Sequence, residues 1–102
     1  MTLDQVTRAD FAACLGQPFA IHLEDGVLTA ELTSVTTLGA QQPSRPGVRE
    51  SFSLIFHVPR SCRFLQGLCH MSHPAMGSME IFLVAIGPDA KGLRLEAIFN
   101  FI

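Results

Sequence analysis

A chain of 102 residues is long enough for one hydrophobic core and too short for two, so we expect a single domain spanning residues 1–102. Nine acidic against seven basic residues give a net charge of −2, which argues against electrostatic capture of nucleic acid or of an anionic membrane. Only 16% of the residues are charged, against about 25% in an average domain, and 48% are apolar, so we expect part of the surface to be covered by a partner.

No segment of the sequence predicts export or membrane insertion. The first residues, Met1 to Gln5, are polar and lack the basic and apolar regions of a signal peptide. The longest uncharged apolar run, Ile81–Ile86, is too short to cross a bilayer. Three cysteines without a pairing pattern are typical of a reducing compartment. We therefore expect a cytoplasmic protein without a membrane partner.

A short helix near the N-terminus is predicted by signals for both of its ends. Thr7 can cap the first turn, and Asp10, three residues later, can complete a capping box. Gly16 supplies a left-handed stop. The apolar stripe of Phe11 and Leu15 is narrow, so we expect this helix to lie against a sheet.

The next predicted element is a β-hairpin that begins at Pro18. Its apolar residues alternate, and Asp25-Gly26 is a pair typical of two-residue hairpin turns. Such a turn pairs Leu23 with Leu28 and places one apolar row opposite another. A register slip of one residue would destroy this match.

The middle of the chain predicts a bulge, a loop and a further strand. Beyond Leu32 the alternation changes phase, which indicates a β-bulge or sharp bend at residues 33–36. Residues Gly39–Glu50 are polar and show no periodicity, and a segment of this length is typical of functional or mobile loops. Alternation returns in Ser51–Val58, and Pro59 ends that strand.

The last third of the chain predicts a weaker strand and then a long hairpin. The weaker strand covers Gln66–His73, and the hairpin pairs Met79–Ile86 with Leu93–Phe99 across the turn-rich segment Gly87–Gly92. The strand Met79–Ile86 is apolar on both faces, which is typical of a central strand or of an interface.

The second face of that hairpin is a candidate interface. It gathers Phe82, Val84 and Ile86, with Ile98 beside Phe82, and Ile55 of the earlier strand is placed to join them. A helix covering this face and a contact with a second subunit are the two alternatives, and one short helix cannot cover a long sheet. We expect a homo-oligomer, or a complex with another protein, that uses these five residues.

One cluster of reactive side chains has the residue types of a metal site. Cys62, Cys69, His70 and His73 offer two sulfurs and two nitrogens, the ligand types of zinc. On a strand, however, Cys69 and His70 point to opposite faces, and Cys69 and His73 lie about 13 Å apart at about 3.3 Å per residue. We therefore predict no metal site among these residues.

Catalytic motifs are missing from the sequence. The histidines fall at turns or opposite the larger apolar row, where surface histidines are expected, and the acidic residues form no adjacent pair. No phosphate-binding loop, dinucleotide fingerprint or serine nucleophile elbow is present. We predict no catalytic residues and no cofactor, and expect that the protein is not an enzyme.

Four arginines define the alternative function. Arg45, Arg49, Arg60 and Arg63 fall in two segments predicted to be irregular. If these segments meet in space, the arginines could bind RNA through its phosphates. We keep an RNA-binding barrel as the second hypothesis.

The order of motifs resembles a small bacterial family of proteins of about this length and unknown function. The motifs are Phe11-x-x-x-Leu15-Gly16-Gln17-Pro18-Phe19, Ser51-Phe52-Ser53-Leu54-Ile55-Phe56, Gln66-Gly67 with His73-Pro74-x-x-Gly77, and Phe82-Leu83-Val84-x-Ile86-Gly87-Pro88-Asp89. The resemblance implies a shared fold and, more weakly, an association with phage-tail-collar-like proteins. It implies no catalytic residues.

These elements together predict an all-β domain with one short N-terminal helix, built as a strongly bent antiparallel sheet or a partly open small barrel. A short helix followed by bent antiparallel strands is similar in architecture to Sm-like and SH3-like barrels, although the RNA-binding signature of Sm proteins is missing. The predicted core consists of ten residues: Phe19, Ile21, Leu32, Phe52, Leu54, Phe56, Ile81, Leu83, Leu95 and Phe99. We expect a structural or interaction module that self-associates.

Overall fold

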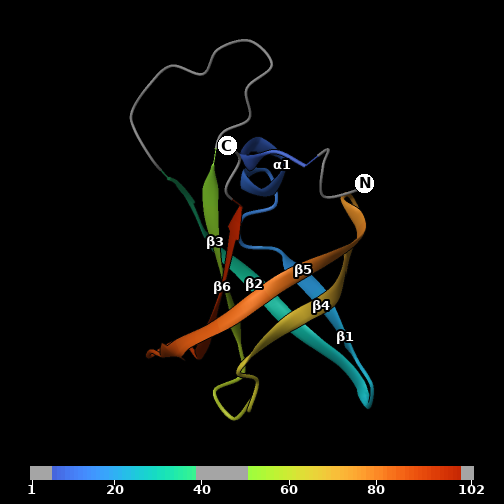
Figure 1. The fold of residues 1–102 in the computed structure, drawn as a ribbon, viewed down its shortest axis with the longest axis vertical. Helices are drawn as coiled ribbons and strands as arrows, with labels where there is room; N and C mark the ends of the chain where they lie inside the picture. The colour runs from blue at the N-terminus through green and yellow to red at the C-terminus, as the bar shows by residue number, and fades with distance from the viewer. Residues whose placement is uncertain (1–5, 39–50, 100–102) are drawn as a thin grey trace.

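The computed structural model describes residues 6–38 and 51–99, which form one short helix and six antiparallel strands (Figure 1). The elements are α1 (Arg8–Ala12), β1 (Pro18–Leu23), β2 (Gly26–Thr37), β3 (Phe52–Val58), β4 (Gln66–His73), β5 (Gly77–Pro88) and β6 (Leu93–Phe99). The predicted all-β class with one N-terminal helix is confirmed. The polar segment Gly39–Glu50, predicted to be a loop, lies outside the described residues.

The six strands close into a barrel in the order β1-β2-β3-β6-β5-β4. Closure depends on a short ladder between β1 and β4, in which Ala20, Ile21 and His22 pair with Ser72, Met71 and His70. The predicted bent antiparallel sheet or small barrel is confirmed as a small barrel, and the structure shows that it is closed. The sequence could not indicate this ladder, because its two strands lie far apart in the chain.

The predicted capping box of α1 is confirmed. The Thr7 backbone N–H donates to Asp10 Oδ2 over 2.8 Å, and the Asp10 N–H donates to Thr7 Oγ1 over 3.2 Å. The helix is shorter than predicted, because it ends at Ala12 and the chain reaches the left-handed Gly16 (φ 85°) through a turn. This turn exposes Leu15, which was expected in the buried stripe; its neighbour Cys14 is buried.

Helix α1 sits at one end of the barrel and closes it (Figure 1). Its Phe11 side chain is fully buried, and the Phe11 ring centroid lies 5.6 Å from that of Phe99, 5.8 Å from that of Phe52 and 6.3 Å from that of Phe19. Aromatic rings at these separations pack in tilted or offset arrangements. In the described part of the chain, no helix is long and apolar enough to cross a membrane.

All ten residues predicted for the core are buried, and the most exposed of them, Phe99, is 9% exposed. Along β5 the alternation is clear, since Met79, Ile81 and Leu83 are buried and Glu80 and Phe82 are exposed. The period-two pattern therefore identified the inner face correctly.

The register of the first hairpin differs from the prediction by two residues. Leu23 pairs with Gly26 instead of Leu28, so the turn consists of Glu24 and Asp25 instead of Asp25-Gly26. No described residue other than glycine has a positive φ, and Gly26 (φ 150°) begins β2 directly after the turn. A shift of two residues keeps each side chain on its face, so the predicted faces survive.

Two bulges shape the outer surface of the barrel. The β2–β3 register shifts between Leu32 and Ser34, which confirms the predicted bulge and makes Thr33 the extra residue. A second shift, between Ala85 and Gly87, makes Ile86 the extra residue of β5. The final turn is consequently shorter than the predicted segment Gly87–Gly92, because β5 continues to Pro88.

Candidate interaction surface

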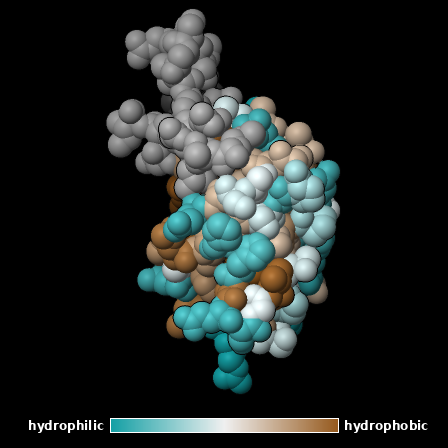
Figure 2. Space-filling model, turned by 90° about the vertical axis from the view of Figure 1, so that its right-hand side faces the viewer, coloured by the Kyte–Doolittle hydropathy of each residue, from teal (hydrophilic) through white to brown (hydrophobic). Residues whose placement is uncertain are grey.

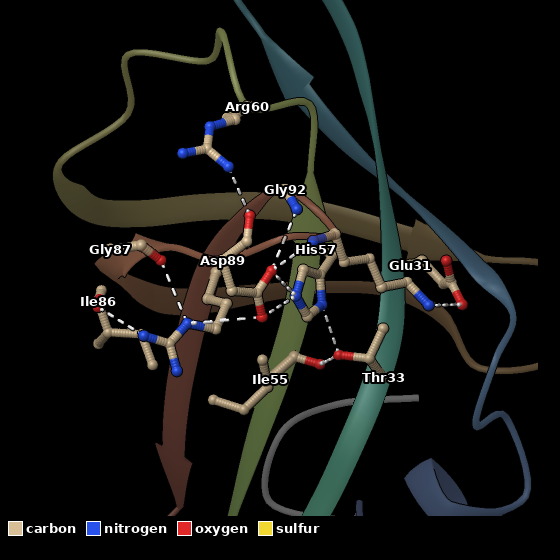
Figure 3. Close-up of polar contacts among 11 residues, drawn as sticks. Glu31, Thr33, Ile55, His57, Arg60, Ile86, Gly87, Asp89 and Gly92 are labelled. Carbon is tan, nitrogen blue, oxygen red and sulfur yellow. Dashed lines mark hydrogen bonds and ion pairs between the residues drawn. The ribbon is translucent and has the colours of Figure 1, made fainter.

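A polar cluster formed by Thr33, His57 and Asp89 lies where the β5–β6 turn folds against β3 (Figure 3). The His57 ring stands between the other two side chains. Its Nε2 lies 3.0 Å from both carboxylate oxygens of Asp89, and its Nδ1 lies 2.8 Å from Thr33 Oγ1. The bulge that makes Thr33 an extra residue helps to place its hydroxyl beside the ring, as bulges often re-aim side chains.

Asp89 joins the β5–β6 turn to this cluster. Its Oδ1 accepts hydrogen bonds from the backbone N–H groups of Lys91 (2.9 Å) and Gly92 (3.2 Å), as a turn aspartate does. The hydrogen bond from His57 and these two backbone bonds lower the pKa of Asp89 from 3.8 to about 2. Asp89 is therefore ionised and fixed in its turn at neutral pH.

The donors and acceptors of the cluster can be assigned from its partners. An ionised carboxylate only accepts, so His57 Nε2 carries a hydrogen, and a neutral ring then accepts the Thr33 hydroxyl hydrogen at Nδ1. The same hydroxyl lies 3.2 Å from the carbonyl oxygen of Ile55, a second acceptor. A ring with hydrogens on both nitrogens would instead donate to Thr33 and free the hydroxyl for Ile55. The cluster thus links β2, β3 and the final turn.

Charged residues surround the polar cluster (Figure 3). Arg60, one of the four arginines singled out for RNA binding, donates from its guanidinium to the Asp89 carbonyl oxygen over 2.8 Å. Arg94 donates to the carbonyl oxygens of Gly87 (3.2 Å) and Ile86 (3.3 Å) beside the second bulge. These two arginines are used to hold loops and turns in place.

Of the other three arginines of the RNA hypothesis, the structure describes one. Arg63 lies exposed in the connection between β3 and β4. Arg45 and Arg49 lie outside the described residues, so their place relative to Arg60 stays a prediction.

The histidines are less uniform than predicted. His22 and His70 are exposed, as expected, whereas the His57 side chain is only 10% exposed and His73 is buried. His73 lies 4.5 Å from the Phe19 ring, measured between centroids, and its Nε2 lies 2.7 Å from Gln17 Oε1. The prediction of surface histidines is therefore wrong for His57 and His73, because contacts distant in sequence cover them.

Two of the side chains considered for zinc, Cys69 and His70, point to opposite faces of β4, as the alternation predicted. Cys69 is buried, and its neighbour His70 points outward. Burial raises the pKa of the Cys69 thiol, and burial with the nearby Asp10 carboxylate raises that of Cys14. Among the described residues, no group of three or more His, Cys, Asp or Glu side chains is arranged to hold a metal ion.

Pockets open on the described surface of the barrel, and two of them are of similar size. One, of about 520 Å³, is lined mainly by β1 and β4 residues that include Phe19 and His73. The other, of about 500 Å³, is lined by Cys62 and Arg63 of the β3–β4 connection together with strand residues. Neither pocket is lined by a member of the polar cluster, so the hydroxyl, imidazole and carboxylate do not border a cavity of this pair.

The face predicted to be an interface is exposed at its centre. Phe82 is 52% exposed and Ile98 is 61% exposed, whereas Val84, Ile86 and Ile55 are half-buried. Helix α1 lies at the barrel end and leaves this face open in the described structure (Figure 1). Helix α1 is therefore not the helix that one of the two alternatives requires to cover this face.

Two further residues modify this face. Leu68 of β4 pairs directly with Phe82 and is 64% exposed, although sequence reasoning did not include it. Glu96 of β6 pairs with Ile55 on one side and with Val84 on the other, so a carboxylate divides the predicted patch. The most exposed apolar residues of these strands are the paired Leu68 and Phe82 and, on β6, Ile98. We call these three residues the outer apolar face.

The distribution of apolar atoms on the surface is uneven. Figure 2 shows one side of the barrel, where apolar atoms form separate patches among polar ones. Scattered apolar side chains are normal on a protein surface, and a contiguous group is the informative feature.

Comparison with known proteins gives a family without an assigned role. The family model described as a domain of unknown function, DUF6916, matches residues 6–99. No curated protein and no solved structure matches the chain.

Proposed function

The chain belongs to the DUF6916 family, a domain of unknown function, and from its geometry we propose that it is a non-enzymatic interaction module that self-associates through the outer apolar face. The observation that carries the proposal is the half-exposed Phe82 ring, which is paired with an exposed Leu68 on β4. Fully burying one such side chain is worth about 1.5–3 kcal/mol.

Partial pairing within the closed barrel bears on how a partner would bind. The β5–β6 ladder covers only residues 84–88 of β5, and the β1–β4 ladder only residues 20–22 of β1. The proposed association uses outward-facing side chains, and the edge-strand pairing that the sequence left open is the alternative. A standard interface buries about 800 Å² on each partner, more than three side chains provide. The half-buried Val84, Ile86 and Ile55 would form the surroundings of the contact.

A second copy of the chain is the occupant that the composition favours. The low charged fraction of 16% leaves a surface suited to burial, and the negative net charge is small. Most soluble oligomers are symmetric homo-oligomers in which the same patch is used on both subunits. Glu96 would set the orientation, because a buried carboxylate must meet a donor on the other copy.

A non-enzymatic role is supported by the hydrogen bonds that the polar cluster makes to backbone groups. Asp89 holds the backbone of its own turn, and Thr33 lies within hydrogen-bond distance of the Ile55 carbonyl oxygen. A catalytic nucleophile needs a free hydroxyl beside a space for substrate. We infer that Thr33, His57 and Asp89 stabilise the fold.

The test is the molar mass in solution, measured by light scattering after size exclusion at micromolar protein concentrations. We expect an oligomer for the natural chain and a folded monomer for Phe82→Glu. The matched control is Leu15→Glu, because Leu15 is 53% exposed, close to the 52% of Phe82, but lies beside α1. A natural chain that stays monomeric, or a Phe82→Glu variant of unchanged mass, would contradict the proposal.

The RNA-binding alternative and the link to phage-tail-collar-like proteins stay predictions. The guanidinium of Arg60 is bonded to a backbone carbonyl, which does not favour the RNA hypothesis. Absorbance at 260 nm in the same experiment measures co-purified nucleic acid. If nucleic acid is present and its binding weakens steeply with salt, the arginine hypothesis gains support.

A further inference from the structure

Two exposed histidines lie side by side on the outer surface where the barrel closes. His22 of β1 and His70 of β4 are directly paired in the short ladder between these strands. Their ring centroids are 5.2 Å apart, and the ring planes are inclined by 59°. Both side chains are exposed, so water and ions reach them.

This spacing suits a shared metal ion. Two imidazoles that bind one tetrahedral zinc ion, each with a Zn–N distance of about 2.0–2.1 Å, have ring centroids roughly 5 Å apart. Paired strands hold the two Cα atoms of such a pair at a fixed short distance, so little side-chain rearrangement is needed.

The surroundings orient one ring and add negative charge. His22 Nε2 lies 2.8 Å from Ser72 Oγ, which leaves Nδ1 of His22 available to a metal. Ligand histidines commonly bond through their other nitrogen to an oxygen in this way. On the other side of His70, its paired residue on β5 is Glu80, whose carboxylate is exposed and favours a cation nearby.

From this geometry we propose that His22 and His70 form a surface site for a first-row transition-metal cation that prefers imidazole, such as Zn²⁺ or Cu²⁺. The chain supplies two nitrogen ligands, and water or an added ligand completes the coordination. This agrees with the lack of a three-residue metal group in the described part of the chain. The proposal does not rest on self-association, although His70 and Glu80 lie next to Leu68 and Phe82 on the outward side of β4 and β5.

Calorimetric titration of the folded protein with Zn²⁺, in a buffer that does not bind metals, tests the site. We expect one ion per chain. His22→Gln and His70→Gln should each lower the affinity by roughly 10- to 100-fold or more, because the loss of an outer-shell partner alone already costs this much. Both side chains are exposed, so circular dichroism and thermal unfolding without metal should be unchanged.

Two controls separate this site from other ligands. His57→Val removes an imidazole that is bonded to Thr33 and Asp89, and Cys62→Ser removes the partly exposed thiol. Both variants should keep the affinity of the natural chain. Paramagnetic resonance of bound Cu²⁺ should show coupling to two nitrogens, and should show one in either single variant of the pair.

Several outcomes would overturn the proposal. They are the absence of Zn²⁺ binding, binding that survives both His22→Gln and His70→Gln, and binding lost in Cys62→Ser. A rise in the melting temperature with Zn²⁺ in the natural chain, lost in both histidine variants, would support it independently of calorimetry.

Discussion

The two ends of the outer β5–β6 surface behave differently. At the turn end the two strands pair from Val84 to Pro88, and Asp89, Arg94 and Lys91 all find partners within the chain. At the other end the described β5–β6 ladder has stopped, and Phe82 and Ile98 are exposed. At the turn end the polar side chains have their partners within a single chain, and at the other end apolar side chains stay exposed to water.

This difference separates folding from association. Polar groups that form hydrogen bonds within the chain stabilise the fold and need no partner. Covering exposed apolar side chains with a partner, in contrast, lowers the free energy of the complex. Changes at the turn end should therefore alter stability without altering molar mass. Changes on the outer apolar face should do the reverse.

The largest effect on folding should come from Gly92→Ala at the turn. Gly92 has φ 152°, and a Cβ built there would lie 2.5 Å from the carbonyl oxygen of Val58. We expect a loss of about 2 kcal/mol or more in the free energy of unfolding, measured by urea denaturation.

Gly26→Ala is the matched control for this prediction. Gly26 has a similar φ of 150°, but its Cβ would meet no atom within 4 Å. Gly26→Ala should therefore lower the free energy of unfolding only by the cost of the strained backbone conformation, about 1 kcal/mol. Equal losses in the two variants would show that the contact with Val58 does not matter.

A second change at the turn end, His57→Val, tests the polar cluster. It removes the main cause of the lowered pKa of Asp89, so the NMR titration midpoint of that carboxyl should rise from about 2 toward 3.8. The folded-state pKa lies below the unfolded value, so ionised Asp89 stabilises the natural fold above pH of about 4, and this is lost as pH falls toward 2. The variant should lose most of this pH dependence, because only the backbone hydrogen bonds from Lys91 and Gly92 still lower the pKa of Asp89.

Arg94→Gln is the control for the pKa of Asp89. Arg94 Nε lies 4.0 Å from Asp89 Oδ2, farther than His57, so its removal should shift the midpoint much less. An Asp89 midpoint that stays near 2 in His57→Val would contradict the assigned hydrogen bond. The molar mass should be unchanged in both variants.

A smaller effect is expected from Lys91→Gln. Lys91 Nζ lies 3.3 Å from Glu31 Oε2, and both side chains are about half exposed. Ion pairs of this kind contribute less than about 1 kcal/mol and weaken with salt. Thermal unfolding at low and high salt should differ less in the variant than in the natural chain. A loss well above this value would mean that the pair is better shielded than its exposure indicates.

The smallest effect on folding should come from Phe82→Ala on the other end of the surface. Half-exposed Phe82 contributes little to a single chain, so the stability of the dissociated protein should change by about 0.5 kcal/mol or less. Denaturation well below the association concentration measures this. A loss as large as that of Gly92→Ala would mean that Phe82 belongs to the core.

Much of the fold follows from local pattern. Alternation located every core residue named from the sequence, the capping box fixed the start of α1, and the phase change after Leu32 revealed the bulge. The hairpin turn was misplaced because the Asp25-Gly26 pair is a strong turn signal, while here the glycine conformation is used one position after the turn.

The sites were harder to predict, because they depend on contacts between distant strands. His57 and Asp89 are 32 residues apart, and they meet through the β3–β6 register and the last turn. His22 and His70 meet only because β1 and β4 close the barrel. Considering each strand alone placed His22 and His70 correctly on the surface, missed the burial of His57 and His73, and gave none of their neighbours. Leu68 was missed for the same reason.

The most direct test of the central claim is an isotope-filtered NMR experiment on a mixture of labelled and unlabelled chains, which detects contacts between copies only. We expect signals that link the methyl groups of Leu68 and Ile98 in one copy with the Phe82 ring of another. Contacts between copies that involve other surfaces and leave these residues without signals, or no contacts at high concentration, would contradict the assignment of the outer apolar face.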